Sequence, residues 1–309
     1  MKLWNSMVRE DAEPAQIYIE KGEWTDSTRQ GRIVPYKIYT PEAKSDGAMQ
    51  ERLPLIVWSH GLGGSREGAG FISRYVASHG YIVVHIQHEG TDSSLWEGKP
   101  GHPWDVIRAT HIPRRATLQR LQDVPFALDE IAKLPQSSRM DLDVIGMSGH
   151  SFGAMTTQVM AGQYRGHGKR RYSLFEPRFK AGILYSPGHA KYPEQYTGIR
   201  LPLLAMTGTD DASPLAEFGW EQRREVFDLS GAHEQHLVII ENGDHMVYNG
   251  SRGKLGVNPK RGVHERIIRV LSLAFWDAYL KGDQAAKEWL AGDGVRAWLG
   301  DEATYTYRA

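Results

Sequence analysis

The stretch DVIGMSGHSFG, residues 143–153, decides the fold of this chain. Its first half is a short apolar, β-branched run, which predicts a buried strand. The pentapeptide GHSFG, residues 149–153, matches the G-x-S-x-G pattern, whose glycines let a strand bend sharply into a helix with the serine at the apex. Residues 154–161 carry the helix-forming Ala, Met and Gln that must follow such a turn. The stretch therefore predicts strand, sharp turn and helix, with Ser151 presented as a nucleophile.

Short apolar runs recur on both sides of this stretch and alternate with segments of helical periodicity. That alternation is typical of an α/β fold in which helices cover both faces of a mostly parallel sheet. The first two runs are joined only by the turn-rich residues 22–31, which predicts an antiparallel hairpin at the N-terminal edge of the sheet. The expected strands are residues 16–20, 33–39, 55–59, 81–87, 144–147, 181–185, 203–207 and 237–241. Two expected helical faces are Leu121, Val124, Leu128 and Ile131, and Ile267, Leu271, Phe275 and Tyr279.

Residues 1–309 are expected to form a single domain, because no linker or repeat interrupts the α/β pattern. Residues 41–54 are polar and predict an exposed connection. Residues 89–115 and 162–178 are longer than an α/β connection needs, and we expect them to form rims or lids over a site.

The composition excludes several classes of function. The 37 Lys and Arg balance the 37 Asp and Glu, so no strong field is present to gather nucleic acid. The absence of cysteine excludes disulfides, thiolate metal sites and a cysteine nucleophile. No apolar run approaches the roughly 20 residues that span a bilayer. Residues 1–14 show no signal-peptide stretch, which favours the cytoplasm, although a mature secreted or periplasmic chain has the same appearance. The oligomeric state stays open.

A serine hydroxyl attacks only when a positioned base removes its proton and an acid orients that base. In α/β-hydrolases the acid and the histidine follow the serine in that order, each after a later strand. His245 follows the last expected strand and is the predicted base. Asp210 and Asp211 both follow the strand at 203–207; Asp211, three residues after a glycine, is preferred as the acid, and Asp210 is the alternative.

The oxyanion of an acyl-transfer intermediate needs two amide donors, one from the residue after the nucleophile and one from a loop after an early strand. Phe152 follows Ser151, and Leu62 lies in the glycine-rich run HGLGG, residues 60–64. We therefore expect the amides of Leu62 and Phe152 to form the oxyanion hole.

Large apolar side chains near these motifs are candidates for a substrate pocket, since most small-ligand sites have apolar walls. The candidates are Trp96, Trp104, Trp220 and Met246. His85, His88 and Asp92 have ligand chemistry for zinc, but their spacing is unspecific, and we interpret them as a hydrogen-bonded cluster that fixes the loop at 89–115. No metal and no cofactor is expected.

Several motifs together resemble the bacterial relatives of platelet-activating-factor acetylhydrolase, often labelled predicted dienelactone hydrolases. The likeness covers residues 18–290 and rests on HGLGG (60–64), HSFG (150–153), TGTDD (207–211), DHM (244–246) and YSPG (185–188), among others. It implies an α/β-hydrolase fold without cofactor, with Ser151, Asp211 and His245 as triad and the amides of Leu62 and Phe152 as oxyanion hole. True dienelactone hydrolases use a cysteine nucleophile, so the resemblance does not imply dienelactone activity here.

The sequence thus predicts a serine carboxylic-ester hydrolase that acts through an acyl-enzyme on a small or lipid-like ester. We expect short acyl chains, because no amphipathic helix has a broad apolar face for binding an interface. The alternatives are a lipase or phospholipid deacylase, a polyester hydrolase, and a non-catalytic binding protein of the same fold.

Overall fold

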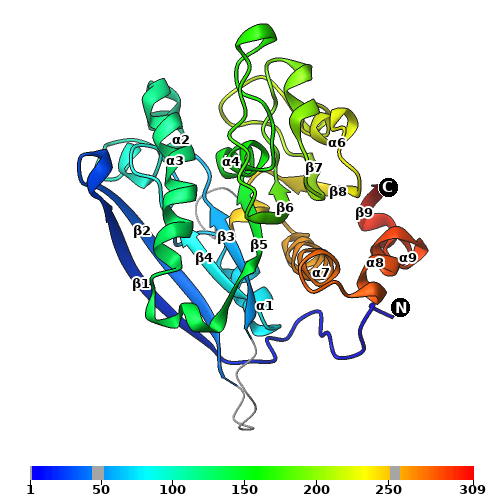
Figure 1. Cartoon of the computed structure of the whole chain (residues 1–309). Coiled ribbons are helices and arrows are strands. Elements are labelled where there is room, and N and C mark those ends of the chain that lie inside the picture. The colour runs from blue at the N-terminus through cyan, green and yellow to red at the C-terminus, as the bar shows by residue number, and fades with distance from the viewer. Residues whose placement is uncertain (1, 44–51, 251–257) are drawn as a thin grey trace.

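The computed structural model describes residues 2–43, 52–250 and 258–309, and most of the predicted connection at 41–54 lies outside them. In this described part of the chain, nine strands form one sheet in the order β1-β2-β4-β3-β5-β6-β7-β8-β9 (Figure 1). The strands are β1 (Ile17–Asp26), β2 (Arg32–Pro41), β3 (Leu53–Ser59), β4 (Ile82–Ile86), β5 (Met140–His150), β6 (Phe179–Tyr185), β7 (Leu203–Asp210), β8 (Gln235–Asp244) and β9 (Ala303–Arg308). The strands from β3 to β8 are mutually parallel. The predicted α/β fold with a mostly parallel sheet is confirmed.

The N-terminal hairpin is longer than the sequence suggested. β1 and β2 pair antiparallel from Ile17 with Pro41 to Asp26 with Arg32, so only residues 27–31 make the turn. The predicted antiparallel hairpin is confirmed, but its turn is shorter than residues 22–31. The indole of Trp24 stacks on the ring of Tyr36, with ring centroids 4.1 Å apart, and this contact favours the longer pairing.

The opposite edge carries a strand that the sequence analysis missed. β9 pairs antiparallel with β8, with Tyr305 opposite Val238. Its sequence ATYTYR alternates small or aromatic residues with polar ones, which is the period of a half-buried strand. The signal was therefore present in the sequence.

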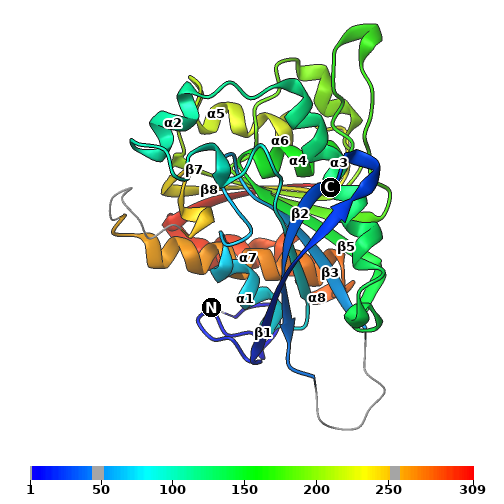
Figure 2. The same ribbon diagram turned by 90° about the vertical axis from the view of Figure 1, so that its left-hand side faces the viewer.

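Helices cover both faces of the sheet (Figure 2). One face carries α1 (Gly70–Ser78), α7 (Arg261–Tyr279), α8 (Gln284–Ala291) and α9 (Asp293–Leu299). The other carries α3 (Arg114–Ile131), α4 (Phe152–Met160) and α6 (Glu225–Leu229). The short helices α2 (Pro103–Ala109) and α5 (Trp220–Arg223) complete the set in the described residues. The predicted apolar faces of α3 and α7 pack on opposite sides of the sheet.

Successive side chains of β3 point to opposite faces of the sheet, so this strand packs against both helical layers. Ile56 and Trp58 join the cluster under α7, whereas Leu55 and Val57 join the cluster under α3. A strand buried on both faces reads as a continuous apolar run, as LIVW does here. Because β3, β5, β7 and β8 are parallel, their carboxyl ends meet at one edge of the sheet, where polar residues follow each strand.

Within the described residues, none of the helices combines the length and the apolar character needed to cross a bilayer.

Candidate active site

Ser151 sits at the sharp turn between β5 and α4. Its backbone has φ 57° and ψ −113°, a conformation that costs energy in a residue with a side chain. The Ser151 amide donates to the carbonyl of Tyr185 at 2.9 Å, which ties the turn to the end of β6. Such strain at a single residue, held by surrounding structure, is the geometry predicted for the G-x-S-x-G turn.

The two glycines of this turn are required by close packing. A Cβ at Gly149 would lie 2.5 Å from the carbonyl group of Gly153. A Cβ at Gly153 would collide with the backbone carbonyl of Ser59 at the end of β3. α4 therefore begins directly against β3, which brings the turn close to the loop that follows that strand.

His245 follows β8 directly and reaches the turn. Its Nε2 lies 3.1 Å from Ser151 Oγ. The carbonyl of His245 accepts a hydrogen bond from Nε2 of His150, at 2.7 Å. Burial lowers the pKa of His150 well below its usual value, so this ring stays neutral and braces the backbone of His245.

Asp211 is fully buried, and its Oδ1 lies 2.8 Å from Nδ1 of His245. Its other oxygen, Oδ2, accepts hydrogen bonds from Thr207 Oγ1, at 2.9 Å, and from Ser186 Oγ. Asp210, the alternative acid, is the last residue of β7 and is exposed. The structure brings Ser151, His245 and Asp211 together and leaves Asp210 outside this group.

Two further residues complete the surroundings of Asp211, and the sequence analysis assigned neither. Ser186, with a positive φ of 56°, places its Oγ 2.9 Å from Nδ1 of His245. Arg223 of α5 is 2 % exposed; its Nε lies 3.0 Å from Asp211 Oδ1 and its Nη2 lies 3.1 Å from His245 Nδ1. Burial lowers the pKa of Arg223, and the negative charge of Asp211 opposes that shift. Ser186 belongs to the motif YSPG noted above, but no local pattern distinguishes Arg223 from the adjacent Arg224.

The loop at residues 60–64 lies beside Ser151. A Cβ built on Gly61 would be 3.4 Å from Cβ of Ser151. The amide of Phe152 is at the first position of α4, where helix geometry supplies no acceptor. Among the described residues, neither this amide nor that of Leu62 donates a hydrogen bond. In this part of the chain, therefore, no protein group is seen to use either amide.

A cavity of about 430 Å³ opens over Ser151 and His245. The predicted pocket residues Trp96, Trp104 and Met246 line it, whereas Trp220, the fourth, is not among its described lining residues. Further walls come from Leu62, His102, Ile107 and Leu215.

The two expected rims behave differently. Residues 89–115 supply one wall of the cavity through α2 and the turn before it, and the indole of Trp96 donates to the carbonyl of Gly63 at 2.7 Å. No described lining residue comes from 162–178, so the second rim that we expected there stays a prediction.

His85, His88 and Asp92 do not form the shared cluster that we expected. His88 contacts Ser59 and Asp123, His85 contacts Ser73, and Asp92 accepts from Gln87 and Ser94. Burial lowers the pKa of His85 to about 3 and that of His88 to about 4. Across residues 2–43, 52–250 and 258–309 there is no group of three or more His, Cys, Asp or Glu side chains arranged to hold a metal ion.

Two comparisons with known proteins match this chain. The family described as platelet-activating factor acetylhydrolase, isoform II, matches residues 36–97, which include the second half of β2, all of β3 and β4, and the loop at 60–64. A curated relative, the platelet-activating factor acetylhydrolase of Canis lupus familiaris, is 28% identical over 143 aligned residues. This alignment covers 34% of this chain and 31% of the relative, so the chain spans less than a third of that protein's length.

Proposed function

From the premise of a platelet-activating-factor acetylhydrolase-like α/β-hydrolase family, which both comparisons support, we propose that this chain is a serine ester hydrolase. Ser151 is the proposed nucleophile, His245 the general base and Asp211 the acid that orients it. The amides of Leu62 and Phe152 are the proposed oxyanion donors. We propose further that residues 1–309 act as a single domain without a cofactor, and the one continuous sheet supports this organisation.

The observation that carries the proposal is the contact series from Ser151 Oγ through the imidazole of His245 to the buried carboxylate of Asp211, with distances of 3.1 and 2.8 Å. A proton on Nδ1 points to Asp211 and leaves Nε2 free to accept the serine proton. Ser59, His88 and Asp123 repeat this order of contacts, but Ser59 is completely buried and is not among the described residues that line the cavity.

In the proposed mechanism, Ser151 Oγ bonds to the ester carbonyl carbon while its proton passes to His245 Nε2. The negative charge develops on the carbonyl oxygen, which the amides of Leu62 and Phe152 bind. Collapse of this intermediate breaks the bond to the alcohol oxygen, which takes the proton from Nε2. Water then attacks the acyl-enzyme by the same route and releases the acid.

The size of the cavity supports a short acyl group, because about 430 Å³ lies near the lower limit of small-ligand sites. The name of the curated relative, which specifies an acetylhydrolase, agrees with this choice. A phospholipid or other lipid-like ester is the second candidate, since that name also specifies platelet-activating factor.

The first experiment compares Ser151→Ala with the wild type on p-nitrophenyl acetate and with a fluorophosphonate label. We expect kcat to fall by roughly 10⁴-fold or more and labelling to disappear. The matched control is Ser148→Ala, a buried serine three residues earlier on β5, which should retain both activities. Wild-type turnover in Ser151→Ala would contradict the mechanism, and a wild type that neither reacts with the label nor hydrolyses an ester would favour a non-catalytic binding protein.

The second experiment measures kcat/KM from acetyl to palmitoyl p-nitrophenyl esters, with a polyester film as an added substrate. We expect a steep fall beyond butyryl. Activity that rises toward palmitoyl would favour a lipase, and release of soluble acid from the film would favour a polyester hydrolase.

A further inference from the structure

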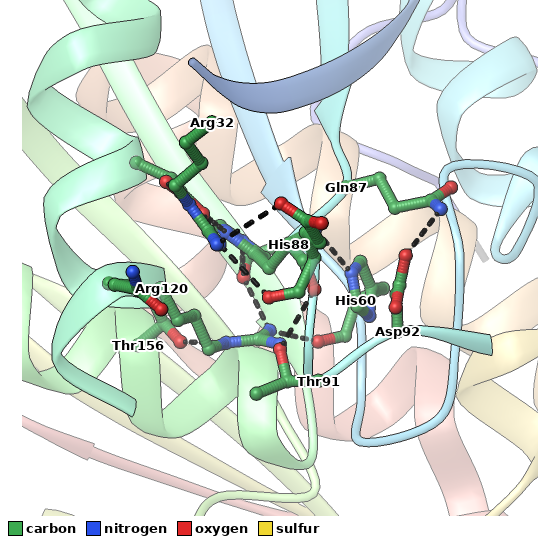
Figure 3. A network of polar contacts seen from close by, with 12 residues as sticks. Arg32, His60, Gln87, His88, Thr91, Asp92, Arg120 and Thr156 are labelled. Atoms are coloured by element: carbon green, nitrogen blue, oxygen red, sulfur yellow. Dashed lines mark hydrogen bonds and ion pairs between the residues drawn. The ribbon is translucent and has the colours of Figure 1, made fainter. Parts of the chain in front are cut away.

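Arg120 of α3 is completely buried, and its side chain lies between Thr156, Thr91 and His60 (Figure 3). Its Nε donates to Thr156 Oγ1 at 2.8 Å, and its Nη1 donates to Thr91 Oγ1 at 3.0 Å. Its Nη2 donates to Ser59 Oγ at 2.8 Å and also to the carbonyl of His60. All three guanidinium nitrogens are therefore engaged by oxygen atoms.

None of these acceptors is a carboxylate. The nearby Asp123 is taken by others: Arg32 donates to both of its oxygens at 2.7 Å, and Arg29 and His88 also contact it. Within the described residues no ion pair involves Arg120. Burying a cation without a counter-ion is costly, and an apolar side chain of similar volume usually serves stability as well. Packing alone therefore does not explain a buried arginine at this position.

Two of the acceptors of Arg120, the His60 carbonyl and Thr156 Oγ1, belong to the segments that carry the amides of Leu62 and Phe152, whereas Thr91 lies outside both segments. The His60 carbonyl lies two residues before Leu62. Thr156 lies one helical turn after Phe152, and its hydroxyl donates to the carbonyl of Phe152 at 2.9 Å. The guanidinium carbon also lies 4.7 Å from the centre of the Phe152 ring. One rigid, planar cation thus spans the gap between the loop after β3 and the first turn of α4.

The ring of His60 holds the same loop from its other side. The amide of His88 donates to His60 Nε2 at 3.0 Å, so the proton of the neutral ring lies on Nδ1 and is donated to the carbonyl of Gly61 at 2.7 Å. Burial, together with the charge of Arg120, keeps the pKa of His60 well below its usual value. The loop is thereby fixed at the carbonyls of His60 and Gly61, and the Gly61 carbonyl belongs to the same peptide group as the Leu62 amide.

We propose that Arg120 is a positioning residue that holds the amides of Leu62 and Phe152 at the separation needed to bind one oxyanion. This inference rests on the proposed serine-hydrolase function and deepens it. Arg120 does not touch the substrate, and it acts through the His60 carbonyl on one side and through Thr156 and the Phe152 ring on the other. A flexible ammonium cannot replace it, because separate nitrogens of one rigid plane reach the two segments: Nη2 reaches the loop after β3 and Nε reaches α4.

The test uses Arg120→Lys, which keeps the charge, and Arg120→Met, which keeps only the volume. Arg32→Lys is the matched control, because Arg32 is also buried and hydrogen-bonded in the same region but contacts neither the loop at 60–64 nor α4. For each folded variant, kcat and KM are measured on p-nitrophenyl acetate, and the affinity is measured for a trifluoromethyl ketone, whose adduct with Ser151 carries an oxyanion. Thermal unfolding of each variant separates a loss of stability from a loss of rate.

We expect Arg120→Lys to lower kcat by about 10- to 100-fold and to change KM less than about threefold. Misplaced amides of Leu62 and Phe152 weaken binding of the transition state but not binding of the substrate. The affinity for the ketone should fall by the same factor as kcat/KM. Arg120→Met should lower kcat and the affinity for the ketone at least as far as Arg120→Lys does. Arg32→Lys should change neither of these two quantities. If Arg120→Lys keeps the kcat of the wild type, or if Arg32→Lys lowers kcat equally, the inference is wrong while the proposed function stands. A wild type without esterase activity would contradict both.

Discussion

Arg223 contacts Asp211 at two points: its Nε lies 3.0 Å from the backbone carbonyl oxygen and 3.0 Å from Oδ1 of the carboxylate. The same guanidinium donates to the carbonyls of Ser186 and Pro187 at 3.3 and 3.0 Å. It thus joins the loops that follow β6 and β7 around the carboxylate that faces His245. In the proposed mechanism the proton on His245 Nδ1 is donated to Asp211 Oδ1, at 2.8 Å. A guanidinium has no acceptor atom, so Arg223 cannot take that proton.

The variant Arg223→Met should destabilise the protein by about 3–5 kcal/mol, because it removes the cation paired with the buried carboxylate of Asp211 and the donor of three carbonyls. Urea unfolding measures this change. The adjacent Arg224 is the matched control: it forms an exposed ion pair with Asp228, and Arg224→Met should cost at most about 1 kcal/mol. Equal unfolding free energies for the two variants would show that Arg223 does not support the site.

The variants Asp211→Asn and Asp210→Asn separate the two adjacent aspartates. Asp211→Asn should lower kcat by about 10⁴-fold, because an amide facing Nδ1 no longer favours the tautomer with a free Nε2. Asp210→Asn should keep the kcat of the wild type, since Asp210 is exposed at the end of β7. Steady-state kinetics on p-nitrophenyl acetate give kcat for each variant. A lower kcat in Asp210→Asn than in Asp211→Asn would make Asp210 the acid.

The variant Gly153→Ala tests the packing of the turn. Its Cβ would meet the carbonyl of Ser59 in the backbone of β3, which cannot move as a side chain can, so we expect a loss of at least about 3 kcal/mol or failure to fold. The control is Gly262→Ala, near the start of α7, where no atom of the described residues, apart from its chain neighbours and the helix backbone, lies within 4 Å of the new Cβ. That change should stabilise the protein by about 0.4–1 kcal/mol. Similar melting temperatures for both variants would contradict the packing argument.

The buried histidines should make stability depend on pH. Burial lowers the pKa of His236 to about 3 from a usual 6.5, so the unfolded chain binds more protons than the folded one between these values. The free energy of unfolding should therefore fall as the pH drops below about 6.5, by up to about 1.4 kcal/mol per pH unit for each such histidine. His85 and His88 contribute in the same direction.

Urea unfolding between about pH 4.5 and 7 measures this slope. His236 lies between the hydroxyls of Tyr305 and Tyr279, away from the cavity, so His236→Gln should flatten the slope and leave kcat unchanged. Asp123, whose pKa is about 2 because bonds from Arg32 and His88 outweigh burial, loses its contribution only at lower pH. An unchanged slope in His236→Gln would contradict the assignment.

By itself the sequence determined the features that local geometry controls. The run GHSFG predicts its sharp turn because two glycines and a preceding apolar strand are all that such a turn needs. The order of strands and helices fixed the α/β class, and it placed His245 and the aspartate pair after the expected strands. Even the missed strand β9 has its period in the sequence.

Only the tertiary structure decided which side chains meet. Asp210 and Asp211 are neighbours with the same chemistry, and they differ because the end of β7 leaves one exposed and buries the other beside His245. Trp220 and Trp104 have the same side chain and were both candidates for the pocket, yet of the two only Trp104 is among the described residues that line the cavity. Arg120 and Arg223 look like surface arginines in the sequence, because their partners are supplied by other strands and loops. Whether an arginine is buried, and which groups it contacts, depends on residues far away in the sequence, and only the folded structure brings those residues together.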